Sequence, residues 1–221
     1  MTPLILDIET GPRPVAEIEP LLPVITAPAN YKDAEKIRAY TDQRRAELIR
    51  DAALDASLGR ILCIGLLSSN GESRFIHDDT SEAALLRQFW TALESKRADE
   101  VFVTFNGSRF DWPFLFRRSL ACGVAVPEWF PRDGRWPRRT HIDLLEAWQC
   151  GDRSETISLD RFARLLGLPG KSGSGAEFGL LWYSDRIRAL EYLTHDLRLT
   201  LAIFERLHPR HTTPARHDEA A

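Results

Sequence analysis

Acidic residues at three places in the chain have the spacing that metal-assisted chemistry requires. The first pair is Asp7 and Glu9, near the end of an apolar run that begins at Pro3. On a strand, residues i and i+2 point to the same face, so these carboxylates would repel each other unless a cation such as a divalent metal lay between them. With 16 Asp and 16 Glu in the chain, about one Asp-x-Glu is expected by chance. Asp33 and Glu35 form such a chance match, in a charged stretch with no strand before it.

The second acidic position is Asp111, which follows the apolar strand expected at 101–105. Asn106 and Gly107 provide a sharp turn out of the sheet. Asp111 then opens a helix near the C-terminal end of a strand, where ligands bind in open α/β sheets. A simple role as a helix cap explains this residue equally well.

The third position combines Tyr192 and Asp196, which lie on one face of an expected helix because they are four residues apart. The chain has four tyrosines, and this one alone has Asp four residues later. About 0.3 such pairs are expected by chance. The alternative is a tyrosine at the core edge beside a solvated aspartate.

Alternating strands and helices must position these residues. Short apolar runs predict strands at 3–8, 60–67, 73–77, 101–105 and 141–145. Apolar residues at helical spacing predict helices at 80–97, 111–122, 159–166, where Ser158 is a plausible cap, and 184–207. The second and third strands form a hairpin and helices connect the others, so the order predicts an α/β fold with a mixed sheet.

The remaining segments suggest one domain with an insertion. A length of 221 residues fits one domain, which we expect to span 1–208, with an insertion at 12–57 and a disordered tail at 209–221. Five prolines in 12–28 predict an extended loop, and the charged segment 32–57 predicts a solvated helix or helix pair. Residues 169–175 predict a flexible loop.

Composition excludes several classes of protein. No apolar run approaches the ~20 residues of a membrane helix, and the N-terminal segment carries acids where a secretory signal would be apolar. The three cysteines lie too far apart in sequence for a zinc-type pair, so a reducing cytoplasm is the expected location. The net charge of −3 does not by itself exclude nucleic-acid binding, because 25 of the 29 basic residues are Arg, which suits phosphate contacts.

In this order, the three acidic motifs resemble the DEDD superfamily of 3′→5′ exonucleases, which has a ribonuclease-H-like fold: a mixed five-stranded sheet flanked by helices. Position 191 is Glu rather than the His of the other subclass, so the match is to the tyrosine subclass. The stretch 106–115, N-G-x-x-F-D-x-P-F-L, resembles the proofreading exonuclease domain of family B DNA polymerases. The motif from Leu159 to Lys171 resembles stand-alone bacterial exonucleases related to that domain.

The resemblance implies a set of site residues. Asp7, Glu9, Asp111 and Asp196 would hold two divalent ions, Mg²⁺ or Mn²⁺, for phosphodiester hydrolysis. Tyr192 would orient the attacking water rather than abstract its proton, because a phenol is a poor base at neutral pH.

Further residues would contact the substrate. The resemblance places Asn106 at the terminal nucleotide, Lys171 at a phosphate and the Thr10 backbone near the 3′ end. Phe110 could pack beside the last base, although core packing explains it better. Asp143 is read either as an acid supporting the site or as a strand-end residue.

A loop at 125–139 alternates arginines with aromatic residues. This is the chemistry of single-strand grooves, but an arginine-rich loop pinned to the core by its aromatics fits equally well. The residues are Trp129, Phe130, Arg132, Arg135, Trp136, Arg138 and Arg139.

The resemblance therefore implies a metal-dependent 3′→5′ exonuclease that releases 5′-mononucleotides from the 3′ ends of single-stranded nucleic acid, with DNA favoured over RNA. It implies no membrane partner, and the oligomeric state stays open. One alternative is a 3′→5′ exoribonuclease or oligoribonuclease, because the same site chemistry serves both sugars. Another is a non-catalytic nucleic-acid-binding module, because fold alone does not determine function.

Overall fold

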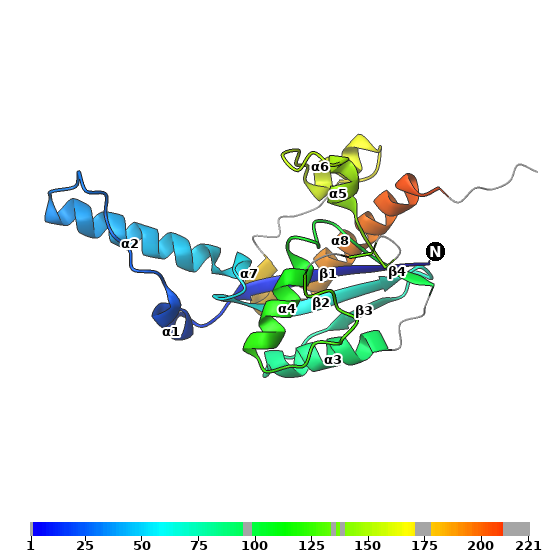
Figure 1. Ribbon diagram of the computed structural model, residues 1–221, viewed down its shortest axis with the longest axis horizontal. Helices are drawn as coiled ribbons and strands as arrows, with labels where there is room; N and C mark the ends of the chain where they lie inside the picture. Colours follow the sequence, from blue (N-terminus) through cyan, green and yellow to red (C-terminus); the bar gives the residue numbers. More distant parts are fainter. Residues whose placement is uncertain (1, 95–98, 134–135, 138–139, 171–177, 210–221) are drawn as a thin grey trace, which may run out of the picture.

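A mixed five-stranded sheet forms the centre of the computed structural model, which describes residues 2–94, 99–133, 136–137, 140–170 and 178–209 (Figure 1). The strand order is β3-β2-β1-β4-β5. Strand β1 pairs antiparallel with β2 and parallel with β4, and the outer strands continue these two patterns. The strands are β1 (Thr2–Pro12), β2 (Gly59–Ser68), β3 (Ser73–Ile76), β4 (Glu100–Thr104) and β5 (His141–Asp143). The predicted α/β fold with a mixed sheet is confirmed.

Helices cover both faces of the sheet. The side chains of a strand alternate between these faces, so β1 contributes residues to two cores. Along β1, Leu6 and Ile8 belong to the core under α3 (Glu82–Glu94) and α4 (Asp111–Ala121), whereas Ile5 belongs to the opposite core. That opposite core includes side chains of α5 (Leu144–Gln149), α6 (Leu159–Leu165), α7 (Phe178–Ser184) and α8 (Arg186–Leu207). Asp7 and Glu9, in phase with Ile5, therefore face α8.

Residues 13–58 form an arm that stands out from the sheet at the end of β1 (Figure 1). The outgoing chain makes the short helices α1 (Val15–Ile18) and η1 (Glu19–Leu21), and the return is α2 (Ala34–Arg50) followed by η2 (Asp51–Leu54). Ile18, Ala52 and Leu58 form a small apolar cluster.

The prediction of a continuous loop at 12–28 is wrong at 15–21. Pro14 occupies the N-cap of α1, and Pro20 lies within the first two positions of η1. Proline is tolerated at these positions because the first N–H groups of a helix have no intrahelical partner. The predicted helix within 32–57 is confirmed as α2 and η2.

Two other boundaries differ from the sequence prediction. The strand expected at 141–145 ends at Asp143, because the Asp143 side chain accepts a hydrogen bond from Leu145 N and starts α5. The last long helix begins at Arg186, where Asp185 caps it by accepting from Arg188 N, and α7 precedes it as a separate helix. The Ser158 cap of α6 is confirmed. The predicted loop at 169–175 lies outside the described residues from 171 onward.

No helix among the described residues combines the length and apolar character needed to cross a bilayer.

Candidate active site

Asp7 and Glu9 point toward α8 from the middle strand of the sheet. Asp7 lies opposite Gly65 of β2, and Glu9 lies opposite Cys63. A Cβ atom added at Gly65 would lie 2.8 Å from Leu197 Cδ1, so Gly65 lets α8 approach the sheet closely. The register shifts between Glu9 and Thr10, and such bulges re-aim side chains next to active sites.

Helix α8 brings Asp196 to the same two carboxylates. One carboxylate oxygen each from Asp7, Glu9 and Asp196 lies within 4.8 Å of the other two. Asp196 is 3% exposed. Three carboxylates this close repel one another unless protons or cations intervene, so the arrangement suits an oxygen-liganded divalent metal.

Tyr192 lies one turn before Asp196 and is buried as well. Burial and then the nearby charges of Asp196 and Glu9 raise the pKa of the Tyr192 phenol above its usual value. The phenol therefore stays protonated at neutral pH and can donate a hydrogen bond to an oxygen in the site.

Asp111 reaches β1 from the opposite helix layer. The parallel pairing of β1 with β4 runs from Thr2 to Ile5, and beyond it Asp111 Oδ1 accepts a hydrogen bond of 3.0 Å from Ile8 N. Burial, and then the charge of Asp7, raises the pKa of the Asp111 carboxyl well above its usual value. Asp111 is thus an electrostatic neighbour of the three-carboxylate cluster.

The alternative that Asp111 is only a helix cap does not describe its contacts. The N-cap position of α4 is Phe110, and Asp111 is the first helical residue. Its carboxylate reaches across to β1, where Oδ1 accepts a hydrogen bond from Ile8 N. This contact spans 103 residues, so local sequence patterns could not reveal it.

The turn from β4 into α4 is fixed by Asp143. Asp143 accepts hydrogen bonds from Asn106 N (2.9 Å) and Ser108 N (2.8 Å), as well as from Leu145 N (2.9 Å). Asn106 has φ +65°, the left-handed conformation that Asn tolerates. Asp143 fits both interpretations, because it is the last residue of β5 and its carboxylate also holds the Asn106 turn.

Gly107 and His141 complete the support of this turn. A Cβ atom at Gly107 would collide with the Thr104 side chain. Thr104 Oγ1 lies 2.8 Å from His141 Nε2. Burial lowers the pKa of His141 to about 4, so its imidazole is neutral at pH 7.

The four residues predicted to bind substrate have different surroundings. Thr10 Oγ1 donates a 2.6 Å hydrogen bond to Ala53 O, which ties the arm to β1. Phe110 is half-buried, and its ring centroid lies 5.5 Å from that of Phe114, in agreement with a packing role. Asn106 is half-buried at the turn. Lys171 lies outside the described residues.

The aromatic residues of the 125–139 loop pack on the core. Phe130 stacks on Phe116 at 5.5 Å between ring centroids, and Trp129 stacks on Phe102 at 6.1 Å. This packing favours the pinned-loop interpretation over a groove. Arg132 is exposed, and Arg135, Arg138 and Arg139 lie outside the described residues.

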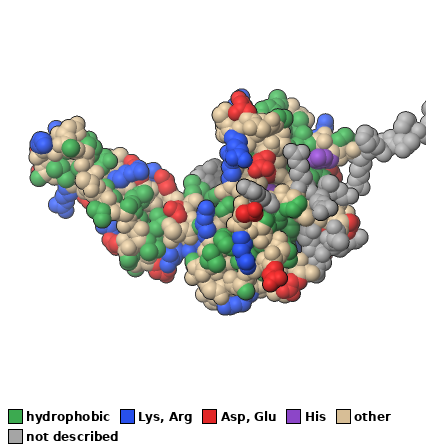
Figure 2. All heavy atoms as spheres, viewed as in Figure 1, with side chains coloured by type: hydrophobic (Ala, Val, Ile, Leu, Met, Phe, Trp, Pro, Cys, Tyr) green, Lys and Arg blue, Asp and Glu red, His purple; other side chains and the backbone are tan. Residues whose placement is uncertain are grey.

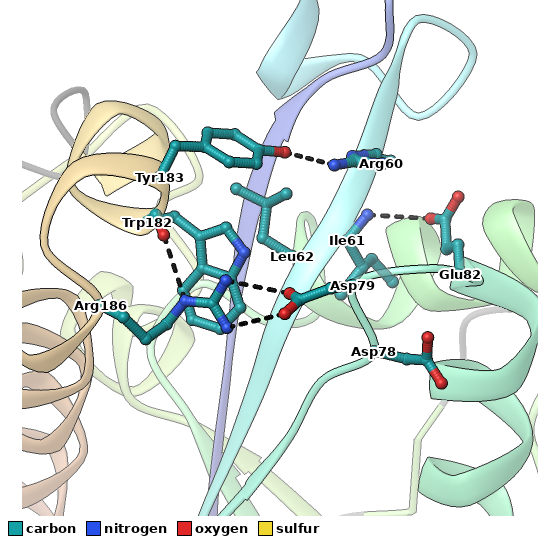
Figure 3. A pocket seen from close by; sticks show the side chains of 9 residues that line it. All are labelled: Arg60, Ile61, Leu62, Asp78, Asp79, Glu82, Trp182, Tyr183 and Arg186. Carbon is teal, nitrogen blue, oxygen red and sulfur yellow. Dashed lines mark hydrogen bonds and ion pairs between the residues drawn. The ribbon is translucent and has the colours of Figure 1, made fainter.

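The start of α8 is anchored across a pocket of about 270 Å³ at the edge of β2 beyond the end of β3 (Figure 3). The Arg186 guanidinium lies 3.7 Å above the Trp182 ring and 2.9 Å from Asp79 Oδ1. Arg60 donates to the Tyr183 hydroxyl on the other side of this pocket. These contacts fix the helix that carries Tyr192 and Asp196. Sequence reasoning missed the Arg186–Asp79 pair, because 107 residues separate its partners.

Comparisons of sequence and of structure both find similarity to DNA polymerases or to a domain related to them. A family model described as "Predicted 3′-5′ exonuclease related to the exonuclease domain of PolB" matches residues 54–214. DNA polymerase 2 of Aeropyrum pernix is 26% identical over 166 residues, which cover 67% of this chain and 20% of that protein. A DNA polymerase of Pyrococcus glycovorans is 24% identical over 147 residues, which cover 59% and 19%, respectively. The chain spans about a fifth of the length of these curated relatives.

The fold likeness extends over nearly the whole chain. The family B DNA polymerase of Pyrobaculum calidifontis superposes with a TM-score of 0.61 at 21% identity, over 95% of this chain and 25% of that chain. At this identity the likeness concerns the fold, and it agrees with the predicted mixed sheet flanked by helices.

Proposed function

The chain belongs to the family of predicted 3′–5′ exonucleases related to the exonuclease domain of PolB, and from this membership we propose that it hydrolyses single-stranded DNA from the 3′ end and releases 5′-mononucleotides. The observation that carries the proposal is the convergence of Asp7, Glu9 and Asp196 within 4.8 Å. DNA is favoured over RNA because the matching relatives are DNA polymerases.

The donor set fits two divalent ions, Mg²⁺ or Mn²⁺. Asp7, Glu9, Asp111 and Asp196 offer only carboxylate oxygens, which these hard cations prefer, and four anions balance two dications. When bound, the ions would lower the pKa of the attacking water and stabilise charge on the phosphoryl group and the leaving 3′ oxygen.

The other side chains would position the reactants. Tyr192, protonated because its pKa is raised by burial and by Asp196, would orient the attacking water through its hydroxyl. Asn106, at the entrance to α4, would contact the terminal nucleotide, whereas Phe110 packs against Phe114. The Thr10 backbone and Lys171 would approach the 3′ end and a phosphate, respectively. Asp143 would act by holding the Asn106 turn rather than by touching the substrate.

A direct test uses a 5′-labelled single-stranded DNA 20-mer with Mg²⁺, Mn²⁺ or EDTA. We expect a ladder that shortens from the 3′ end, requires metal, and slows by at least about a thousandfold in Asp7→Asn. Asp152→Asn is the matched control, because Asp152 is an exposed acid whose carboxylate accepts hydrogen bonds from Ser154 N and Ser154 Oγ. Asn accepts the same bonds in such a turn, so this variant should keep full activity.

Each other result would change the proposal in a defined way. Full activity of Asp7→Asn would refute the assigned site. Hydrolysis of a matched RNA 20-mer, with the DNA left intact, would refute the choice of substrate. If neither polymer were shortened but both bound tightly with metal present, the protein would be a non-catalytic binding module.

A further inference from the structure

The arm, residues 13–58, lies largely outside the family match, which begins at residue 54. All 17 residues of α2 are described, and none of them is buried. A helix that is polar on every side does not pack against a core. Helix α2 is therefore not needed to complete the sheet and its helix layers, and its surface is available to something outside this fold. The base of the arm does contribute, because Ala56 belongs to the core under α3 and α4 and its carbonyl accepts a hydrogen bond from Arg118.

The tip of the arm has a hollow of about 680 Å³ whose lining is rich in groups that suit nucleic acid. It contains two of the four lysines and two of the four tyrosines in the chain. Its polar and aromatic lining residues are Asn30, Tyr31, Lys32, Asp33, Lys36, Tyr40 and Gln43.

Lysine and tyrosine side chains make up half of the lining of this hollow. Tyr31 is 37% exposed and meets Tyr40 edge-to-face, with 5.7 Å between the ring centroids. Asp33 is the acidic residue of the lining, and its carboxylate accepts a hydrogen bond from Lys36 N, so it serves the helix start. Ammonium groups bind phosphates, and exposed aromatic rings stack on bases of a single strand.

We propose that the arm tip is a second binding site for the substrate strand, contacting it several nucleotides upstream of the 3′ end. The inference rests on the exonuclease function proposed above. Lys32 and Lys36 would bind phosphates, and Tyr31 would present its ring to a base.

The position of the arm supports this assignment. Its base joins β1 immediately after Glu9, through Thr10 Oγ1 to Ala53 O and through Arg13 N to Leu58 O. The arm then projects away from the body beyond the end of β1 (Figure 1), with Lys and Arg side chains exposed along it among acidic ones (Figure 2). Helix α2 is about 25 Å long at 17 residues. A stacked strand rises about 3.4 Å per nucleotide and a fully extended single strand reaches about twice that, so a strand of three nucleotides is too short to reach from the carboxylates to the tip.

The test compares kcat/KM for a DNA 3-mer and a DNA 20-mer in wild type and in the double variant Lys32→Ala/Lys36→Ala. We expect the variant to lose about tenfold on the 20-mer and to match wild type on the 3-mer, which is too short to reach the tip. The dependence of log(1/KM) on log[salt] should become shallower by about 1.4 for the 20-mer, because two phosphate contacts are lost. Tyr31→Ala should lower kcat/KM for the 20-mer in the same selective way.

Arg38→Ala is the matched control. It removes one positive charge from the same helix, but Arg38 pairs with Asp42 and does not line the hollow. It should leave both substrates unaffected. Equal losses on the two lengths, or equal losses in Arg38→Ala, would overturn the proposal.

The failure of this inference is distinguishable from failure of the proposed function. If wild type hydrolyses neither length, the exonuclease proposal fails and this inference fails with it. If wild type hydrolyses both and the double variant is unchanged, the arm inference alone fails. If the double variant instead abolishes self-association seen by sedimentation while kcat/KM is unchanged, the tip binds a second copy and the strand-binding proposal is wrong.

Discussion

Strand β1 carries two residues of the carboxylate site, Asp7 and Glu9, and leads directly into the arm, residues 13–58. Asp7 and Glu9 lie beside Asp196 and Asp111, which come from two helices on opposite faces of the sheet. The arm begins at residue 13 and is held by contacts among its own residues and with the strand ends at its base. The first region is assembled from distant parts of the chain, whereas the second is local.

The difference has energetic consequences. The carboxylate site buries like charges, which destabilises the fold in the absence of cations. The arm buries little, and surface pairs such as Arg38–Asp42 and Arg44–Glu47 contribute little each. Substitutions around the site should therefore have large effects of either sign on stability, and substitutions in the arm should have small ones.

Gly65→Ala should produce the largest change in this comparison. The new Cβ would lie 2.8 Å from Leu197 Cδ1 and 3.0 Å from Leu193 Cγ, so these side chains must shift, and we expect α8 to move away from the sheet with them. Such overpacking costs about 1–3 kcal/mol. Displacing Tyr192 and Asp196 by about 1 Å should lower kcat about a hundredfold. Urea unfolding and single-turnover hydrolysis would measure the two effects.

Gly179→Ala is the control for that substitution. A Cβ atom at Gly179, in α7, meets no described atom within 4 Å, and alanine is the better helix former. We expect unchanged activity and equal or slightly higher stability. Wild-type kcat in Gly65→Ala would show that the spacing between α8 and the sheet does not control the site.

The contrast between local contacts and contacts across the chain also explains which parts of the site the sequence could predict. Asp7 and Glu9 share a strand and Tyr192 and Asp196 share a helix, so periodicity alone indicated that each pair lies on one face. The bond from Asp111 to Ile8 and the clamp of Asp143 on Asn106 depend on tertiary packing, which periodicity does not encode. The short helices α1 and α5 were missed because four to six residues give too little periodicity to separate a helix from a loop. Helix α6, as long as the missed α7, was predicted because the capping residue Ser158 marks its start.

Asp111→Asn should raise the stability of the metal-free protein. Burial and Asp7 raise the pKa of Asp111 above the ordinary 3.8, so above about pH 4 the folded state holds this proton more tightly than the unfolded state. The free energy of unfolding therefore falls as pH rises through this range. Asparagine carries no charge, and we expect a gain of about 1–2 kcal/mol at pH 8 in EDTA that disappears toward pH 4.

Asp143→Asn is the contrasting variant for thermal unfolding in EDTA. Asp143 accepts three backbone hydrogen bonds, and an amide has one acceptor oxygen for them, so stability should fall by about 1–3 kcal/mol.

Added Mg²⁺ should stabilise wild type by ligand linkage and Asp111→Asn much less. A loss of stability in Asp111→Asn at pH 8 would contradict the view that repulsion dominates at this acid.

Shortening the arm should have the smallest effect on stability. Pro23 and Asp42 line one hollow of the arm, so residues 24–41 can be replaced by a short Gly–Ser linker while Ile18, Ala52 and Leu58 are retained. The exposed segment contributes little packing, and we expect the free energy of unfolding to change by about 0.5 kcal/mol or less. Hydrolysis of a DNA 3-mer should be unchanged, because its reaction uses only the carboxylate site. A shortened arm that lowered stability by several kcal/mol would show that this helix supports the fold, and the contrast between a convergent site and a local arm would then be wrong.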